Sequence, residues 1–457
     1  MSDIGLLTIV LAAGKGTRMK SNMPKVLHKI AGQSMLGHVL SLANARSEAK
    51  TAVVVGPDMD DVQNEVRKIS PGSDVFVQHR QQGTADAVLA AREALEGHTG
   101  DVLVLYADTP LIKAETLEKL AGELRNGAGV AVLGFEAANP TGYGRLLTND
   151  KGELLAIREE KDASETERKV RLCNSGVLAF GVDNLLSVLD RIGNDNANGE
   201  YYLTDAIEVA RADGQSARVV QCSEDEVLGV NTRVQLAEAE AIWQTRTRKS
   251  AMLSGVTMLA PETVTLAFDT AIGPDVIIEP NVFFGPGVSI EADVTIKANC
   301  HLEGIDAKSN KGVVVKSGSV IGPFARLRPG AHLSDDVHIG NFVEVKNATL
   351  GQGAKANHLS YVGDATIGDD CNIGAGTIFC NYDGFDKARS ALGNSVFIGS
   401  NSAIVAPVDI GEGAYVAAGS TITKDVAKDA LAIERAPQSQ RNGWAANFRT
   451  AKSSGKG

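Results

Sequence analysis

The chain has 457 residues, and 43% of them are hydrophobic, which is enough for ordinary folded cores and too many for a disordered protein. Its net charge of −11 argues against nucleic acid or an anionic membrane as a partner of the whole protein, although local basic pockets remain possible. The longest early apolar run, residues 6–13, is shorter than the ~20 residues that span a bilayer.

The first residues include Asp3 and lack the basic segment of a signal peptide. The five cysteines show neither CxxC nor zinc-ligand spacing, and an odd number without such a framework is typical of a reducing compartment. We therefore expect a cytoplasmic protein.

The first half alternates between two patterns. Continuous apolar runs at residues 6–11, 51–55, 74–77 and 102–106 are typical of buried parallel strands, and residues 86–96 and 114–125 have helical spacing. This β-α-β alternation predicts a doubly wound, Rossmann-like α/β domain. In such sheets, ligands bind at the carboxyl ends of the strands, where the strand order reverses.

A glycine-rich loop, Leu-Ala-Ala-Gly-Lys-Gly-Thr-Arg-Met at residues 11–19, follows the first strand. It lacks the third glycine of a dinucleotide-binding loop and the Lys-Ser/Thr pair of a Walker loop. Small residues still let backbone N–H groups approach an anion, and Lys15, Arg18 and Lys25 add positive charge. The loop predicts a phosphate site, the alternative being a tight turn with solvated basic side chains.

Residues 232–249 lack Gly and Pro and are rich in Ala, Glu and Arg, which predicts a long linking helix. Val234, Ala237, Ala241 and Ile242 are expected near one face of it. We place the domains at 1–231, with the linker at 232–252 and a second domain at 253–457.

In the second half an aliphatic or aromatic residue returns every six positions, as in Ile272, Ile278, Phe284 and Ile290. A period of six does not fit a helix but fits short strands separated by turns, so it predicts a parallel β-helix of about seven or eight coils, in preference to an irregular β-sandwich. The repeat is interrupted at residues 303–320 and 380–397, and such internal loops usually build a site or a contact.

His358 is the candidate general base of this half, the alternative being an inert exposed histidine. A coil of about 17 or 18 residues is expected to stack Glu344 and Lys346 beneath His358 and Tyr361, with Asn372 above. A carboxylate beside an imidazole raises its basicity and fixes its tautomer, so we expect Glu344 to orient His358.

The motifs of the first half resemble those of the sugar-1-phosphate nucleotidyltransferases. The matching segments, in chain order, are residues 11–19, 24–25, 82–85, 106–108 (where many members have Gly in place of Ala107), 142–145, 159–162, 174–176 and 229–231. Together with the hexapeptide half, residues 5–443 resemble the family of bifunctional N-acetylglucosamine-1-phosphate uridyltransferases/glucosamine-1-phosphate acetyltransferases. All substrate-specific expectations follow from this resemblance, including the left hand of the β-helix.

For the first half, the resemblance implies uridylyl transfer from UTP to N-acetylglucosamine 1-phosphate, releasing pyrophosphate. The attacking phosphate is already anionic, so cations and positioning matter more than a general base. Arg18 and Lys25 are implied to neutralise the phosphates, and Asp108 and Asn231 to bind Mg²⁺. The implied contacts to UTP and sugar are Leu11, Ala12, Ala13, Gly14, Gln78, Gly83, Thr84, Tyr106, Gly144, Glu159 and Asn174. Taken alone, Glu159 could be a surface carboxylate beside Lys161, and Asn231 a helix N-cap.

For the second half, the resemblance implies acetyl transfer from acetyl-CoA to glucosamine 1-phosphate, with His358 as base and Glu344 as its orienting residue. The implied sugar-phosphate contacts are Arg328, Lys346, Tyr361, Asn372 and Lys387, and the implied acetyl-CoA contacts are Ala375, Asn381, Tyr382, Ser400, Ala418 and Arg435. The basic excess after Lys424 suits the phosphates of coenzyme A, whereas the last ten residues are expected to be a solvated tail.

The family implies a homotrimer with sites shared between neighbouring subunits. The competing hypothesis is a nucleotidyltransferase alone, with the β-helix as an oligomerising or regulatory scaffold. A scaffold has no reason to contain the cluster His358, Lys346, Tyr361, Asn381 and Tyr382, so we favour the bifunctional enzyme.

Overall fold

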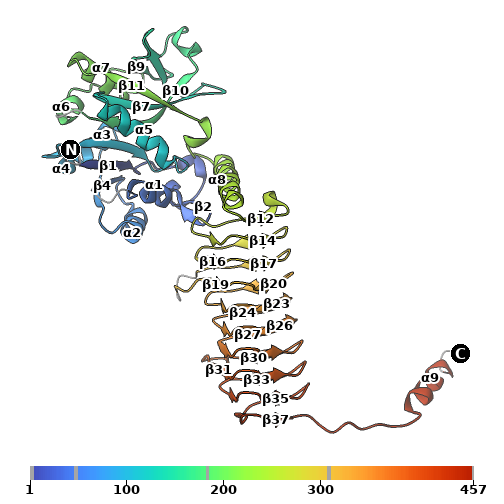
Figure 1. Cartoon of the computed structure of the whole chain (residues 1–457). Helices are drawn as coiled ribbons and strands as arrows, with labels where there is room; N and C mark the ends of the chain where they lie inside the picture. The colour runs from blue at the N-terminus through green and yellow to red at the C-terminus, as the bar shows by residue number, and fades with distance from the viewer. Residues whose placement is uncertain (1–4, 46–49, 182–184, 306–309, 455–457) are drawn as a thin grey trace. The chain divides into compact units, whose positions relative to one another are not determined.

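The computed structural model describes residues 5–45, 50–181, 185–305 and 310–454. It divides into two compact units, Met1–Arg246 and Thr247–Gly457, and the division falls inside helix α8 (Arg233–Leu253) (Figure 1). The expected linking helix is therefore present, but of the four residues expected on its apolar face Ile242 alone packs against the core, and Val234, Ala237 and Ala241 are exposed. Val234 is 69% exposed, whereas Leu236, Ile242 and Trp243 pack against a core cluster of the first unit.

Within the described residues, unit 1 contains a nine-stranded sheet in the order β11-β7-β10-β6-β1-β4-β5, with β8 and β9 off this path. Its strands are β1 (Leu6–Leu11), β4 (Lys50–Val55), β5 (Asp74–Val77), β6 (Asp101–Tyr106), β7 (Val130–Glu136), β8 (Arg145–Thr148), β9 (Leu154–Arg158), β10 (Leu172–Phe180) and β11 (Ala217–Cys222). A small pair is formed by β2 (Lys29–Ile30) and β3 (Gln33–Ser34). The four predicted strands are confirmed, and β1 pairs in parallel with both β4 and β6, so the strand order reverses beside β1.

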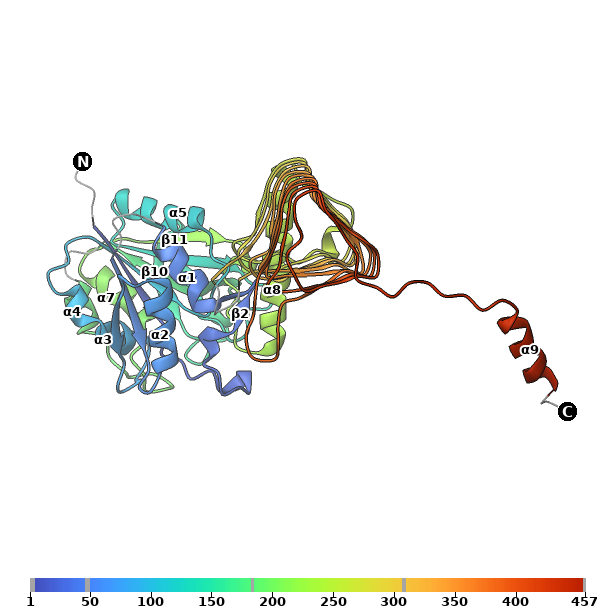
Figure 2. The ribbon, with the colours of Figure 1, turned by 90° about the horizontal axis from the view of Figure 1, so that it is seen from below.

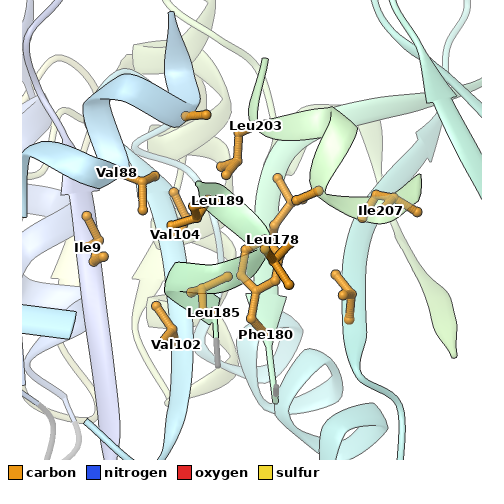
Figure 3. Close-up of a cluster of buried hydrophobic side chains, with 14 of the residues drawn as sticks. Ile9, Val88, Val102, Val104, Leu178, Phe180, Leu185, Leu189, Leu203 and Ile207 are labelled. Atoms are coloured by element: carbon orange, nitrogen blue, oxygen red, sulfur yellow. The ribbon is translucent and has the colours of Figure 1, made fainter. Parts of the chain in front are cut away.

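Helices cover both faces of this sheet, as a doubly wound fold requires. They are α1 (Met35–Ala43), α2 (Asp60–Ile69), α3 (Thr84–Ala90), α4 (Arg92–Leu95), α5 (Ala114–Arg125), α6 (Leu185–Leu189) and α7 (Ala206–Ala212). One core lies between the sheet and α3, α6 and α7, where Val88, Leu189 and Ile207 meet Val104 and Phe180 from the strands (Figure 3). The other lies between the opposite face and α1, α2 and α5.

Unit 2 is a parallel β-helix, and Figure 2 shows its three-sided cross-section. In the described residues its three sheets have ten, eight and eight strands, so the β-helix has eight complete coils, the larger number expected, and two further strands in the first sheet. The first sheet consists of β12 (Thr257–Met258), β14 (Ile277–Ile278), β17 (Thr295–Ile296), β20 (Val320–Ile321), β23 (His338–Asn341), β26 (Lys355–His358), β29 (Asn372–Ile373), β32 (Phe397–Ile398), β35 (Tyr415–Val416) and β37 (Leu431–Ala432).

The second sheet consists of β13 (Ala271–Ile272), β16 (Val288–Ile290), β19 (Val313–Val315), β22 (His332–Leu333), β25 (Thr349–Leu350), β28 (Ala365–Ile367), β31 (Ser390–Leu392) and β34 (Asp409–Ile410). The third consists of β15 (Phe283–Phe284), β18 (His301–Leu302), β21 (Arg326–Leu327), β24 (Glu344–Lys346), β27 (Tyr361–Gly363), β30 (Ile378–Cys380), β33 (Ala403–Val405) and β36 (Thr421–Ile422).

The six-residue period places one aliphatic side chain per strand inside the column. Ile278, Ile296, Ile321 and Ile339 follow one another in register in the first sheet, and each is at most 1% exposed. Ile278 pairs with Ile296, 18 residues further on, whereas Ile296 pairs with Ile321 and Ile373 with Ile398, both 25 residues on. Each interruption of the repeat therefore adds seven residues to one coil without ending the stack.

Beyond the last coil, helix α9 (Trp444–Ser454) covers most of the segment that we expected to be a plain solvated tail, and all its described side chains are exposed. None of the helices in the described ranges is long and apolar enough to cross a membrane.

Candidate active sites

The cleft of unit 1 lies where the carboxyl ends of β1 and β6 meet. Ala12 N–H donates to the carbonyl of Val54 (2.7 Å) and Ala107 N–H to that of Leu11 (3.0 Å), so the loop residues extend the strand pairing. The cleft has a volume of about 360 Å³ and contains most of the predicted nucleotide contacts. Its lining residues include Leu11, Ala12, Ala13, Gly14, Lys15, Lys25, Gln78, Gly83, Thr84, Tyr106 and Asp108.

Cations and oxygen ligands converge at one side of this cleft. The Lys25 ammonium lies 2.5 Å from Asp108 Oδ2 and 3.0 Å from Asn231 Oδ1, and Arg18 Nη2 donates to the same Asn231 oxygen at 2.8 Å. Val230 N–H donates to the carbonyl of Asp108 (2.9 Å), which ties the loop before α8 to the end of β6. Asn231 Oδ1 is thus turned toward the cations, so its side chain does not serve as an N-cap.

Gly16 permits the approach of Lys25. Its φ is +62°, and a Cβ atom added there would lie 2.3 Å from the Cβ of Lys25. Only glycine combines this left-handed backbone with so close a contact, which explains the glycine at this position of the loop.

The far side of the cleft holds Gln78 in a fixed orientation. Its Nε2 donates to the carbonyl of Gly83 (3.0 Å) and to Asp86 Oδ2 (2.8 Å), two acceptors that only the NH₂ end of the amide can satisfy. Oε1 is therefore the end left for the cleft. Burial, reinforced by the charge of Asp108, raises the pKa of the neighbouring Tyr106.

The predicted sugar contacts gather around β8 and β10. Asn174 N–H donates to the carbonyl of Gly144 (2.8 Å), and a Cβ on Gly144 would lie 3.3 Å from Glu159 Oε1. Burial raises the pKa of Glu159, and Lys161 donates to Asn198 (2.7 Å), so Glu159 is not the surface partner of Lys161. A partly buried carboxylate is thereby held beside the Gly144 backbone.

His358 lies at the end of β26, on the edge between the first and third sheets of unit 2. The backbone continues along this edge through residues of the predicted acetyl-CoA path. Gly376 N–H donates to the carbonyl of His358 (3.2 Å), Asn401 N–H to that of Ala375 (2.7 Å), and Gly419 N–H to that of Ser400 (2.8 Å). Arg435 Nη1 donates to the carbonyl of Ala418 (2.9 Å), so these residues form one column beyond the imidazole.

The prediction that Glu344 contacts His358 is wrong. In this structure His358 Nδ1 lies 3.0 Å from Asn341 Oδ1, because these coils repeat after 17 residues and pair Asn341 with His358. Glu344 pairs with Tyr361 on the next sheet and binds Arg328 (2.8 Å) and Arg326 (3.2 Å). Asn372 pairs with Lys355, so it does not lie above His358 either.

A second polar cluster lies on the third sheet. Asn381 Nδ2 donates to Tyr361 Oη (3.3 Å) and to Asp364 Oδ2, and Lys346 Nζ lies 3.8 Å from the same carboxylate oxygen. A Cβ on Gly363 would lie 2.3 Å from Tyr361 Oη, so a side chain there would displace the Tyr361 ring. Lys387 contacts Lys346. The hydrogen bond with Lys346 and its positive charge lower the pKa of Lys387. The sequence prediction missed Asn341 and Asp364, both visible only once the 17-residue register is known.

Sequence comparisons place the chain among known transferases. Residues 8–170 match the MobA-like NTP transferase domain, residues 365–384 the hexapeptide repeat of succinyl-transferase, and residues 390–424 the bacterial transferase hexapeptide family of six repeats. The chain is 59% identical over 457 residues to the bifunctional protein GlmU of Xanthobacter autotrophicus, covering 100% of both chains. It is 58% identical over 452 residues to the bifunctional protein GlmU of Azorhizobium caulinodans, covering 99% of both.

Proposed function

The chain belongs to the family of bifunctional GlmU proteins, and from this membership we propose how its two activities are divided between its two units. It is a bifunctional enzyme with N-acetylglucosamine-1-phosphate uridyltransferase and glucosamine-1-phosphate acetyltransferase activities. We assign uridylyl transfer to Met1–Arg246 and acetyl transfer to Thr247–Gly457. The observation that supports this division is that unit 1 holds the converging cations while unit 2 holds the column of His358.

Uridylyl transfer requires that two anions be brought together. Arg18 and Lys25 neutralise phosphate oxygens, and the Gly14 region of the loop offers backbone N–H groups. Asp108 and Asn231 fit a magnesium site, because their oxygens converge within 3.0 Å of one ammonium, Lys25 Nζ, and are of the hard type that Mg²⁺ prefers. Held there, Mg²⁺ would supply further charge neutralisation, and phosphate oxygens and water would complete its coordination.

Gln78 gives the cleft a physical basis for choosing UTP. With its NH₂ group bound to Asp86 and Gly83, its Oε1 accepts from the N3–H of uracil. Cytosine has an acceptor at N3 and would face this oxygen without a proton between them. On the other side, Glu159, Asn174 and Gly144 hold the N-acetylglucosamine.

Acetyl transfer requires a free amine and a base. With Asn341 Oδ1 accepting from Nδ1–H, the lone pair of His358 lies on Nε2, which takes the proton from the sugar ammonium. Acetyl-CoA lies along the column Ala375, Ser400, Ala418 and Arg435, which ends in a cation suited to its phosphates. Arg328, Lys346 and Lys387 bind the phosphate of the sugar.

A homotrimer is supported by an apolar ladder of Phe324, Phe342 and Leu359 next to His358. These side chains are 48%, 56% and 60% exposed, and the two rings stack with centroids 5.2 Å apart. All three have left-handed backbones, a strained conformation for bulky residues that persists where function requires it. We assign the ladder to contact with a second copy of the chain. The cysteines, free throughout the described ranges, support a cytoplasmic location.

Phe342→Asp is expected to dissociate the oligomer and to lower acetyl transfer by about 10-fold or more, because a buried unpaired charge at an interface costs several kcal/mol. Uridylyl transfer should remain within about two-fold. Light scattering and the two activity assays check this, and Phe268→Asp, at an exposed phenylalanine of the first coil, is the control. An unchanged oligomer would contradict the assignment of the ladder.

The proposed function as a whole is tested by product analysis. Glucosamine 1-phosphate, acetyl-CoA, UTP and Mg²⁺ are supplied together, and one component is omitted at a time. Omitting acetyl-CoA should stop all product formation, whereas omitting UTP or Mg²⁺ should let N-acetylglucosamine 1-phosphate accumulate. Acetylation that stops without Mg²⁺, or no acetylation at all, would contradict the division.

A further inference from the structure

Asp364 lies at the turn between β27 and β28 and is 8% exposed. Its carboxylate accepts from Asn347 Nδ2 (2.5 Å) and from Asn381 Nδ2, and it forms an ion pair with Lys346 at 3.8 Å. Its main chain is bound as well, because its N–H donates to the carbonyl of Lys346 (3.0 Å) and its own carbonyl accepts from Ser390 N–H (3.2 Å). A buried carboxylate with this many hydrogen-bond and ion-pair partners is fixed in position.

The segment that Asp364 holds is the second interruption of the repeat. From Asn381 to Ala388 the chain forms a small hairpin, with a bridge between Tyr382 and Lys387 and a hydrogen bond from Ala388 N–H to the carbonyl of Asn381 (3.0 Å). Asp364 contacts the first residue of this hairpin through the Asn381 side chain, and through the Ser390 backbone it contacts strand β31, which follows the hairpin. The hairpin contains three of the residues assigned above to acetyl transfer: Asn381, Tyr382 and Lys387.

The carboxylate also determines how the Asn381 amide is turned. Asp364 Oδ2 and Tyr361 Oη both contact Asn381 Nδ2, so the NH₂ end faces these two groups and Oδ1 points elsewhere. Tyr361 in turn extends over Gly363. One carboxylate thereby links Lys346, Tyr361 and Asn381, which come from three successive parts of the third sheet.

We propose that Asp364 is a positioning residue for acetyl transfer, holding the Asn381–Ala388 hairpin, the Asn381 amide and the Lys346 ammonium in the geometry that binds glucosamine 1-phosphate. This inference rests on the acetyltransferase assignment of unit 2. Asp364 acts through its neighbours and does not itself touch the reacting atoms.

The charge of Asp364 has a second consequence, for the paired lysines. The charged or titratable groups that face Lys387 are Lys346, Asp364 and Tyr361. The contact with Lys346 lowers the pKa of Lys387, and the charge of Asp364 opposes this shift. Two adjacent ammonium groups facing a single carboxylate form a site for a further anion, such as a sugar phosphate.

The hairpin also has an anchor that does not involve Asp364. Arg389 donates to the carbonyl of Ala365 (2.7 Å), to the carbonyl of Asn347 (3.1 Å) and to Thr366 Oγ1 (3.1 Å). The isosteric Asp364→Asn variant is therefore expected to keep the fold of the β-helix while losing the negative charge.

The test is the steady-state rate at which the full-length Asp364→Asn protein acetylates glucosamine 1-phosphate. The rate is measured from the release of the coenzyme A thiol. We expect kcat/KM to fall by about 10- to 100-fold, the usual effect of losing hydrogen bonds to a charged group, mainly through a higher KM for the sugar. The alkaline limb of the pH profile should move to lower pH, because Lys387 loses the carboxylate that favours its charged form. Uridylyl transfer should be unchanged.

The matched control is Asp336→Asn, since Asp336 is also a turn aspartate with a left-handed backbone but is exposed. It should leave both activities and the pH profile unchanged. If Asp364→Asn alters neither KM nor the pH profile, the inference is overturned. A fall in activity with an unmoved alkaline limb would also overturn it, because that is what loss of a merely structural contact predicts.

A double-variant cycle separates this inference from the function on which it rests. If Asp364 acts through Asn381, the Asp364→Asn change should have much less effect in the Asn381→Ala protein than in the natural one. Strict additivity would overturn the inference, whereas full acetylation by Lys346→Ala and Asn381→Ala would overturn the acetyl-site assignment itself. Should Asp364→Asn not fold, the exchanged pair Asp364→Asn/Asn381→Asp keeps a carboxylate–amide contact and must recover activity above that of Asn381→Asp.

Discussion

Acetyl transfer by a His358→Ala protein is expected to be lower by about 100- to 10,000-fold, because general-base catalysis typically contributes that much. The amine of glucosamine 1-phosphate is protonated near neutral pH, and this variant lacks the imidazole that we propose takes its proton. Uridylyl transfer should stay within about two-fold, since we assign it to the other unit. The two activities are measured separately, as thiol release and as pyrophosphate release.

The control for this variant is His332→Ala, which removes a histidine from β22, on a different sheet of the β-helix. It should change neither rate. If His358→Ala lowers both activities together, the division of labour between the units is wrong. Asn341→Ala should lower acetyl transfer less than His358→Ala does, because it releases the ring without removing it.

Asp108→Ala is expected to lower Mg²⁺-dependent uridylyl transfer by about 100- to 1,000-fold, the usual effect of removing one electrostatic contact in a preorganised site. The loss has two physical causes, since the carboxylate is both a proposed metal ligand and the partner that holds the Lys25 ammonium at 2.5 Å. Pyrophosphate release measured over a range of Mg²⁺ concentrations checks both the rate and the metal requirement.

Asp213→Ala is the matched control, because Asp213 is an exposed carboxylate of the same unit that pairs with Arg191. It should leave uridylyl transfer unchanged, and acetylation should survive both substitutions. UTP turnover that is unaffected by Asp108→Ala would refute the metal role. A Mg²⁺ dependence identical to that of the natural protein would do the same, even if the rate fell.

Much of the architecture could be predicted because it depends on periods that the sequence displays directly. The step of six residues that places Ile278, Ile296 and Ile339 inside the column also fixes which side chains point outward. Likewise, the apolar run of β1 and its glycine-rich loop predicted a cleft at the strand ends, where Lys25, Asp108 and Asn231 do converge.

The errors arose where a period alone was not enough. The coil repeat pairs His358 with Asn341, whereas Glu344 lies three residues further along the chain and pairs with Tyr361 on the next sheet. On α8 the polar and small residues are spread all round the helix, so the spacing of Val234 and Ala237 did not identify the buried face. Asp364 was missed because its partners Asn347 and Asn381 each lie 17 residues away, one on either side.

Because the coils stack at a regular spacing, the series of residues from His358 to Arg435 has a defined length. From His358 through Ala375, Ser400 and Ala418 to Arg435 there are four steps of backbone, which at the ~4.8 Å spacing of neighbouring strands amount to about 19 Å. A donor molecule whose charged end meets the guanidinium must therefore have an arm of that reach to bring its acyl group to the imidazole. Inserting or deleting one whole coil would keep the hydrogen bonds between neighbouring coils. It would change only the length of the donor molecule that fits between Arg435 and His358.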